Sequence, residues 1–438
     1  MLLYSTKNKN NQASLQEAVM KGLPDDNGLY MPEHIPQLDP NFIQNLSQYS
    51  FLEIAQEVCT TLFGEIIPLA DLKNILENSM DFPAPVVKLD EQKYILELFH
   101  GPSLAFKDFG ARFMAQLMSY FNQGNDRELT ILVATSGDTG GAVAAGFYQT
   151  PGIRVVILYP SGKVSMLQEK QLTTLGHNIS ALEINGTFDD CQAMVKQAFL
   201  DVELNKKLRL SSANSINIAR LIPQSFYYFE AFKQLPKEGA PIVFCVPSGN
   251  FGNITAGLLA AKMGLPVHHF IAATNVNDVV PAYIETGEYK ARPSVRTLSN
   301  AMDVGNPSNF ARMLDLYLGS DDCSTWNNLK ERISGYAFDD AKTAEIMRMV
   351  DQKYGYTLDP HGAVGYLALE EHQREHPNTR GVILETAHPA KFLDDVEEIL
   401  GHRIEVPERL AELADREKKA DRLEAEYGEL REWLERNS

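Results

Sequence analysis

The chain has 438 residues, more than one hydrophobic core usually organises, so two or three domains are expected. Its 44% hydrophobic and 22% charged residues are typical of a globular protein and exclude a disordered or fibrous one. A net charge of −18 argues against a general affinity for nucleic acid or anionic membranes, so any anionic ligand must be bound by local cations.

The four cysteines are scattered and form no CxxC pair, so neither a zinc site nor a disulfide framework is expected. The amino terminus, MLLYSTKNKN, lacks the apolar run of a signal peptide, and no stretch is long and apolar enough to span a membrane. We therefore expect a cytoplasmic protein that uses no metal and has no membrane partner.

Residues 1–92 are expected to form a separate lead-in domain. Ser14 and Glu17 make a capping box ahead of a short helix, and FLEIAQEVCTTLFG repeats its apolar residues at helical spacing. The stretch DFPAPVVKL marks a proline-rich join to the next domain. Because the segment holds no nucleophile or glycine-rich loop, we expect it to cover an active-site face or to make a subunit contact.

Residues 93–402 alternate short apolar runs with helical patterns, which predicts an α/β fold with a largely parallel sheet. The strand candidates are YILELF, TILVAT, IRVVILY, ISALEI, IVFCV, HFIAAT and GVILET. Ligands of such sheets bind beyond the carboxyl ends of the strands, so the loops that follow these runs are the candidate sites.

Residues 403–438 are dense in Glu, Arg, Lys and Leu, and we expect a charged helical tail. Leu423, Tyr427, Leu430 and Leu434 follow alternating spacings of four and three, which predicts one apolar stripe. With fewer than three clean heptads, a helix docked on its own domain is favoured over a coiled-coil partner.

Lys107 lies among apolar neighbours in HGPSLAFKDFGARFMA, at the start of a predicted helix. Burial disfavours the ammonium form, and a neutral amine is the nucleophile that a Schiff base with a carbonyl cofactor requires. A surface lysine whose stem covers apolar neighbours would fit this stretch equally well.

The loop SGDTGGAVAAG follows one predicted strand and leads into a helix, whose free N–H groups attract anions. Its small residues would also serve merely to pack the helix tightly on the sheet. Ser136, Asp138 and Thr139 add hydrogen-bonding side chains at the turn, which favours ligand binding.

The loop PSGNFGN, residues 247–253, lies between a strand and a helix and resembles a phosphate cradle. It lacks the spacing of a dinucleotide loop and the lysine of a nucleotide-triphosphate loop, so a phosphate monoester on a compact cofactor fits better.

Two further loops carry polar groups. SSANSINIARL places Asn214, Ser215 and Arg220 near a helix start, where the arginine could hold a phosphate or carboxylate or simply be exposed. In ETAHPAKF, the Thr386 hydroxyl could contact a ring nitrogen, whereas His388 is expected to be a loop or capping residue.

Together, the lysine and the two loops indicate pyridoxal 5′-phosphate. HGPSLAFKDFG, ATSGDTG, PSGNFGN and TAHPAKF closely resemble signatures of the threonine synthase family, which are fold type II pyridoxal-phosphate enzymes. The opening segment also resembles that family, so the likeness runs from residue 1 to about residue 402. It implies two open parallel-sheet α/β subdomains in residues 93–402, an added amino-terminal domain and a carboxyl-terminal charged helix.

The resemblance implies a role for each matching residue. Lys107 would hold the cofactor and act in catalysis, and Thr386 would face the pyridine nitrogen. The cofactor phosphate would be bound by Gly249, Asn250, Phe251, Gly252 and Asn253. The substrate would be held by Ser136, Thr139, Asn214, Ser215 and Arg220, with Lys163 or Arg112 as further candidate cations. Asp138 stands where many relatives carry an asparagine that meets the 3′-oxygen of the cofactor, so it would need a proton or another partner.

The reaction implied is the conversion of O-phospho-L-homoserine and water to L-threonine and phosphate. Rival interpretations are a serine or threonine dehydratase of the same fold and a non-catalytic binding protein that has kept it. The sequence leaves a monomer and a homodimer equally open, and it leaves open how Asp108 and Arg112 set the pKa of Lys107.

Overall fold

The structure, a computed structural model, describes residues 1–437, which contain three β-sheets. The smallest sheet belongs to the amino-terminal segment and joins β1 (Leu2–Ser5), β2 (Gln12–Ser14) and β3 (Tyr30–Pro32) in antiparallel pairs. The segment continues with α1 (Leu15–Lys21), α2 (Pro40–Gln44), α3 (Phe51–Phe63) and α4 (Leu69–Ser79). The predicted capping box is confirmed, because Ser14 caps α1 and the Glu17 carboxylate accepts from the Ser14 N–H at 2.8 Å.

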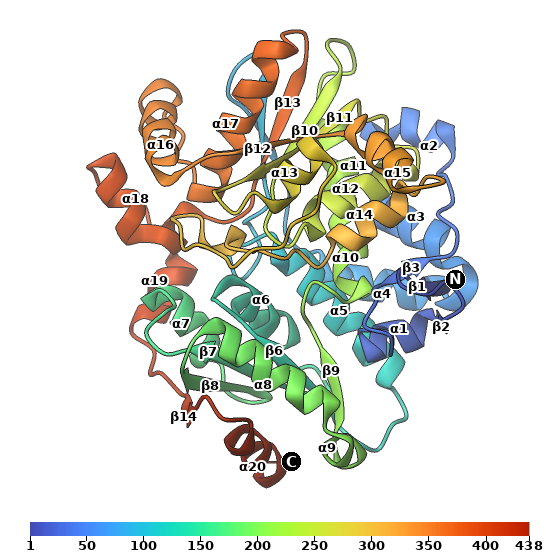
Figure 1. Cartoon of the computed structure of the whole chain (residues 1–438), viewed down its shortest axis with the longest axis vertical. Helices are drawn as coiled ribbons and strands as arrows, with labels where there is room; N and C mark the ends of the chain where they lie inside the picture. Colours follow the sequence, from blue (N-terminus) through green and yellow to red (C-terminus); the bar gives the residue numbers. More distant parts are fainter. Residues whose placement is uncertain (438) are drawn as a thin grey trace.

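The six-stranded sheet has the order β12-β11-β10-β13-β5-β4, and only the edge strand β4 is antiparallel to its neighbour. Its strands are β4 (Val86–Lys88), β5 (Lys93–Glu97), β10 (Ile242–Pro247), β11 (His269–Thr274), β12 (Ile333–Ala337) and β13 (Arg380–Glu385). The associated helices are α11 (Phe226–Gln234), α12 (Gly252–Lys262), α13 (Val279–Thr286), α14 (Phe310–Leu316), α15 (Asp322–Lys330), α16 (Asp340–Tyr354), α17 (Pro360–Glu375) and α18 (Leu393–Leu400). This sheet occupies the upper half of Figure 1.

The five-stranded sheet is parallel throughout, with the order β14-β8-β7-β6-β9. Its strands are β6 (Leu129–Ala134), β7 (Ile153–Pro160), β8 (Ile179–Asn185), β9 (Arg209–Ser212) and β14 (Asp421–Glu424). The helices in this region are α5 (Lys107–Asn122), α6 (Asp138–Phe147), α7 (Met166–Thr173), α8 (Phe188–Leu200), α9 (Val202–Lys207) and α10 (Ile218–Leu221). All seven predicted strands are confirmed, and the two sheets give the two parallel-sheet α/β units expected.

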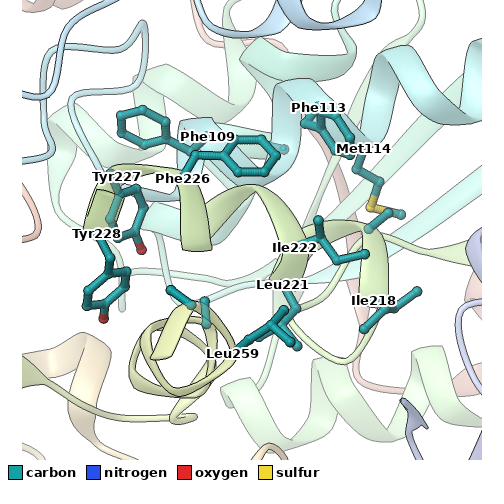
Figure 2. Close-up of a cluster of buried hydrophobic side chains, with 14 of the residues drawn as sticks. Phe109, Phe113, Met114, Ile218, Leu221, Ile222, Phe226, Tyr227, Tyr228 and Leu259 are labelled. Atoms are coloured by element: carbon teal, nitrogen blue, oxygen red, sulfur yellow. The ribbon is translucent and has the colours of Figure 1, made fainter. Parts of the chain in front are cut away.

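The largest apolar cluster includes residues from strands of both large sheets. Figure 2 shows the part of it formed by side chains of α5, α10, α11 and their neighbours. Phe109 of α5 packs edge-on against Tyr227 of α11, with ring centroids 5.2 Å apart. Phe113 and Phe226 make a similar pair at 5.9 Å, and all four side chains are fully buried. This packing fixes the axis of α5, whose first residue is Lys107.

The carboxyl-terminal tail differs from the predicted single helix. It forms α19 (Glu408–Ala414), the strand β14 and α20 (Tyr427–Arg436), and Leu423 lies in the strand. β14 adds to the edge of the five-stranded sheet beside β8, so sheet pairing overrides the local helical pattern. Leu430 and Leu434 are buried against the α8 region, which confirms that the tail docks on its own domain (Figure 1).

None of the helices within residues 1–437 has the length and apolar character needed to cross a membrane.

Candidate active site

Lys107 and Thr386 are brought together by a short backbone pairing. The Phe106 N–H donates to the Thr386 carbonyl at 2.9 Å, and the His388 N–H donates to the Leu104 carbonyl at 3.0 Å. The segment before α5 therefore runs antiparallel to the loop that leaves β13, although the two are about 280 residues apart. Leu104 adopts a left-handed φ of 59° to make this turn.

Lys107 is half-buried and carries an amine that loses its proton unusually easily. Burial lowers its pKa from 10.5 to about 8, and the positive charges of Lys391 and Arg220 reinforce the shift while Asp138 opposes it. The charged groups that act on Lys107 are thus Asp138, Lys391 and Arg220, whereas the sequence had left open a role for Asp108 and Arg112. Arg112 pairs with Asp81 at 2.8 Å, away from the lysine.

Asp138 lies at the start of α6 and has a partner that the sequence did not indicate. Its Oδ1 atom lies 2.8 Å from the Nζ atom of Lys391 and accepts from Gln168 Nε2 at 3.0 Å. Burial alone would raise the pKa of this carboxyl, but Lys391 and Lys107 hold it well below its usual range. Asp138 is therefore ionised and paired, which answers whether it needs a proton or another partner.

The loop from Gly249 to Asn253 leads from β10 into the N-terminus of α12. Phe251 caps the helix in a left-handed conformation with φ 59°, which turns successive N–H groups toward one concave surface. The Asn253 side-chain oxygen accepts hydrogen bonds from the hydroxyls of Tyr227 at 2.7 Å and Tyr228 at 2.8 Å. Its Nδ2 group is buried without a protein acceptor, so a donor is left free for a ligand.

Arg220 is almost fully buried, with 2% of its surface exposed. One Nη atom donates to the Ala213 carbonyl, whereas Nε has no partner, and no carboxylate of residues 1–437 forms an ion pair with this guanidinium. Burial lowers its pKa to about 10, which still leaves it charged. Asp108 offsets part of this effect without an ion-pair contact, and an anionic ligand in contact with the guanidinium would lower the cost of its burial.

The other residues predicted to bind the substrate lie in the segment before α10 and at the start of α6. Asn214 and Ser215 are half-buried just before α10, and the Asn214 side-chain oxygen has no protein partner. The fully buried Arg312, which the sequence did not single out, holds this loop by donating to the carbonyls of Ser215 at 3.5 Å and Ile216 at 2.7 Å. Ser136 is exposed in the turn before α6, Thr139 is half-buried in the first turn of α6, and Lys163 is exposed after β7.

Glu385, which directly precedes Thr386, belongs to a hydrogen-bonded network with Asp359 and His361. Glu385 is fully buried and accepts from the Asp359 N–H at 2.5 Å, and burial together with the Asp359 charge raises its pKa well above the ordinary value. Asp359 also binds His361 Nδ1 at 2.5 Å, and His361 Nε2 accepts from the Ala301 N–H at 3.2 Å. His388, as predicted, is a capping residue, since its Nδ1 accepts from the Ala390 N–H at 3.1 Å.

Comparison with known proteins covers the chain from end to end. Family profiles described as "Threonine synthase N terminus", "Pyridoxal-phosphate dependent enzyme" and "Threonine synthase, C-terminal" match residues 3–80, 81–386 and 362–433. Threonine synthase of Escherichia coli K12 is 47% identical over 436 residues, which cover 99% of each chain. The chain belongs to the threonine synthase family. It is accordingly a pyridoxal-phosphate-dependent lyase of fold type II with threonine synthase function.

Solved structures of the family share its whole architecture. The crystal structure of threonine synthase from Escherichia coli superposes with a TM-score of 0.92 at 46% identity and covers 100% of both chains. That of PLP-bound threonine synthase from Brucella melitensis gives 0.94 at 36% identity and covers 100% and 99%. The likeness therefore extends past residue 402 into the tail, where the sequence had shown no recognisable signature.

The residues of this threonine synthase family member fit pyridoxal phosphate. The free Asn253 amide and the first N–H groups of α12 offer donors to a phosphate, and Lys107 offers an amine of lowered pKa. A Cβ atom on Gly249 would lie 2.5 Å from the Ala301 carbonyl, so the loop lies against backbone and admits no larger residue there. Lys391 and Gln168, which the sequence did not identify, complete the polar surroundings of the lysine.

Proposed function

We propose that this enzyme converts O-phospho-L-homoserine and water to L-threonine and phosphate, with the residue roles given below. The observation that carries the proposal is the buried Arg220 guanidinium, whose Nε has no hydrogen-bond partner within residues 1–437. Its positive charge also lowers the pKa of Lys107. An enzyme whose substrate carries a phosphate and a carboxylate needs such a cation in a protein whose net charge is −18.

Lys107 would hold the cofactor through its amine, and Gly249 to Asn253 would bind the cofactor phosphate. When bound, pyridoxal phosphate supplies an aldehyde for the substrate amine and a ring that stores the electrons released at Cα. The Lys107 amine, once released, would take the proton from Cα and then from Cβ of the substrate. A pKa of about 8 suits this role, because the amine and ammonium forms are both populated near neutral pH.

Arg220, Asn214 and Ser215 would hold the anionic groups of the substrate, with Ser136 and Thr139 at the facing turn. Arg220 would orient the leaving phosphate at Cγ and stabilise its negative charge. Water would then add at Cβ, and the phosphate that has left is an internal base for that water. Thr386 would face the pyridine nitrogen with a hydroxyl, which cannot hold that nitrogen protonated as a carboxylate would.

A dehydratase of the same fold would need the lysine and the phosphate loop but no cation for a second phosphate. The buried Arg220 therefore favours threonine synthesis over ammonia release from serine or threonine. A non-catalytic protein would have no need of a lysine with a lowered pKa.

The test measures phosphate release and threonine formation from O-phospho-L-homoserine by the wild type and by Lys107→Ala. We expect the variant to lose activity by a factor of about 1,000 or more, because it loses both the cofactor tether and the proton carrier. Full activity in the variant would refute the role of Lys107, and activity on threonine but not on O-phospho-L-homoserine would favour the dehydratase.

We also propose the localisation, the binding partners and the domain division of the protein. We expect a cytoplasmic enzyme that binds neither nucleic acid nor membranes, as a monomer or a homodimer. The division into residues 1–92, 93–402 and 403–438 remains a proposal: the small antiparallel sheet lies within the first segment, but β4 of that segment and β14 of the tail pair with strands of the central region.

A further inference from the structure

A buried ion pair joins the two α/β units, and its lysine bonds the Ser103 carbonyl in the segment that leads into Lys107. Asp138 begins α6 of the five-stranded unit, whereas Lys391 follows β13 of the six-stranded unit. Their side chains are 5% and 0% exposed, and the Oδ1 and Nζ atoms are 2.8 Å apart. Both elements also pack in apolar clusters.

The partners of the pair are all within hydrogen-bond distance. Lys391 Nζ also donates to the Ser103 carbonyl at 2.8 Å, and Gln171 Nε2 donates to the same carbonyl at 3.0 Å. Gln168 Nε2 donates to the Asp138 carboxylate at 3.0 Å. The ammonium and the carboxylate are thus each fixed by at least two partners, so the pair has one defined geometry.

Three elements place charges that act on Lys107. Asp138 comes from α6, Lys391 from the turn after β13 and Arg220 from α10. On α5 itself, the buried Asp108 accepts from the Ser103 N–H at 2.8 Å, and burial raises its pKa to about 6. Asp138 is therefore the anion that favours the charged form of Lys107, and Lys391 is the cation that offsets it.

The charge balance decides which form of Lys107 dominates. A buried carboxylate with no other cation would pair with the Lys107 ammonium and hold its proton, because an opposite charge nearby favours the charged form. Because Lys391 forms an ion pair with Asp138, the two charges sum to zero. The burial of Lys107 then outweighs the attraction of the carboxylate and favours the neutral amine.

We propose that Lys391 is a positioning residue that occupies the Asp138 carboxylate and so leaves the Lys107 amine free to bond to the cofactor. In that step the amine nitrogen bonds to the aldehyde carbon and one water leaves, with no change in oxidation state. The inference rests on the proposed role of Lys107, but it is tested on the cofactor-free protein.

The experiment measures the labelling of Lys107 by a trace amine-reactive reagent as a function of pH, quantified by peptide mass spectrometry. Lys391→Met should slow labelling at neutral pH by about tenfold, which corresponds to a pKa raised by one unit. Asp138→Asn should lower the pKa of Lys107 and so speed its labelling at neutral pH. The double variant should return to within about threefold of the wild type, because the two charges removed cancel. Lys391→Arg, which keeps the charge, should follow the wild-type profile.

The proposal is overturned if the Lys107 pKa shifts in the same direction in both single variants, or shifts in neither. A merely structural role of the pair does not predict that the two charge removals have opposite effects that cancel in the double variant. The single variants leave one charge buried alone, so their folding is checked by circular dichroism. If they do not fold, the proposal is tested on the wild type and the double variant alone. In the wild type, Lys107 must be labelled before Lys391, and the reverse order would refute the pairing of Lys391 with Asp138. In the double variant, a pH profile of Lys107 labelling that differs from the wild type would refute it as well. A wild-type protein that shows the expected labelling pattern but forms no threonine from O-phospho-L-homoserine would instead refute the proposed function.

Discussion

The Phe106 N–H donates to the carbonyl oxygen of Thr386 at 2.9 Å, and this bond places the start of α5 beside the end of β13. The lysine at position 107 and the Thr386 hydroxyl are thereby held by adjoining backbone, on elements far apart in the chain. Rigid backbone of this kind fixes the reacting groups better than a free loop would.

Replacement of Thr386 by Asp should change the products of the reaction. A carboxylate would hold the pyridine nitrogen protonated, which makes the ring a stronger electron sink and favours early protonation and loss of intermediates. We expect threonine formation to fall by about tenfold, equivalent to 1.4 kcal/mol of transition-state stabilisation, with a larger share of 2-oxobutyrate. Thr386→Ser keeps the hydroxyl and is the control; an unaltered product ratio in Thr386→Asp would contradict this account.

Gly249→Ala should weaken cofactor binding. The new Cβ would lie 2.5 Å from the Ala301 oxygen and 2.9 Å from Met302 Cα, so the phosphate loop would have to move. We expect the dissociation constant of pyridoxal phosphate, measured by equilibrium titration, to rise by about tenfold or more. Gly428→Ala, at an exposed helical position with open space, is the matched control and should leave binding unchanged. Equal affinity in both variants would show that the loop tolerates the methyl group.

Stability should fall on acidification from pH 6.5 to pH 4, partly because of His372. Burial lowers the pKa of this imidazole from 6.5 to about 4, helped by the nearby His376. In that interval the unfolded chain binds a proton that the folded chain does not, so the free energy of unfolding decreases as pH falls. This stabilisation is present in full above pH 6.5. Between pH 6.5 and pH 4, the free energy of unfolding falls by up to about 1.4 kcal/mol for each pH unit.

The check is the denaturant midpoint of wild type and His372→Phe across this interval, with the exposed His34→Gln as control. The slope of stability against pH should be smaller in His372→Phe and unaltered in His34→Gln. His269, which stacks on His372 with ring centroids 5.3 Å apart, also has a pKa lowered to about 4, chiefly by burial, so part of the slope should persist.

Lys418→Met should destabilise the protein through the tail. Lys418 Nζ contacts the carboxylates of Glu183 at 2.8 Å and Glu169 at 2.7 Å, and Glu183 is 4% exposed. Loss of these charge-assisted bonds should lower the free energy of unfolding by about 1.5 to 3 kcal/mol, measured in denaturant. Lys206→Met breaks an exposed pair with Glu203 and should change stability by less than about 1 kcal/mol. Similar losses in the two variants would contradict the role given to the tail.

The sequence by itself determined seven strands of the two large sheets, the capping box at Ser14 and the capping role of His388. Each depends on a local pattern: apolar runs between turns, a Ser and Glu at fixed spacing, and a polar side chain just before a helical turn. It also indicated Lys107 and the loop at Gly249, because burial of a lysine and a glycine-rich turn before a helix are visible in consecutive residues.

Only the tertiary structure decided which charges meet. Lys391 lies within the recognised motif TAHPAKF, yet nothing in its neighbours shows that its ammonium pairs with Asp138, 253 residues earlier. The same holds for the tail, where the pattern around Leu423 is helical but an open sheet edge beside β8 makes it a strand. Local sequence fixes propensity, whereas ion pairs and strand partners depend on which surfaces the folded chain brings within a few ångströms.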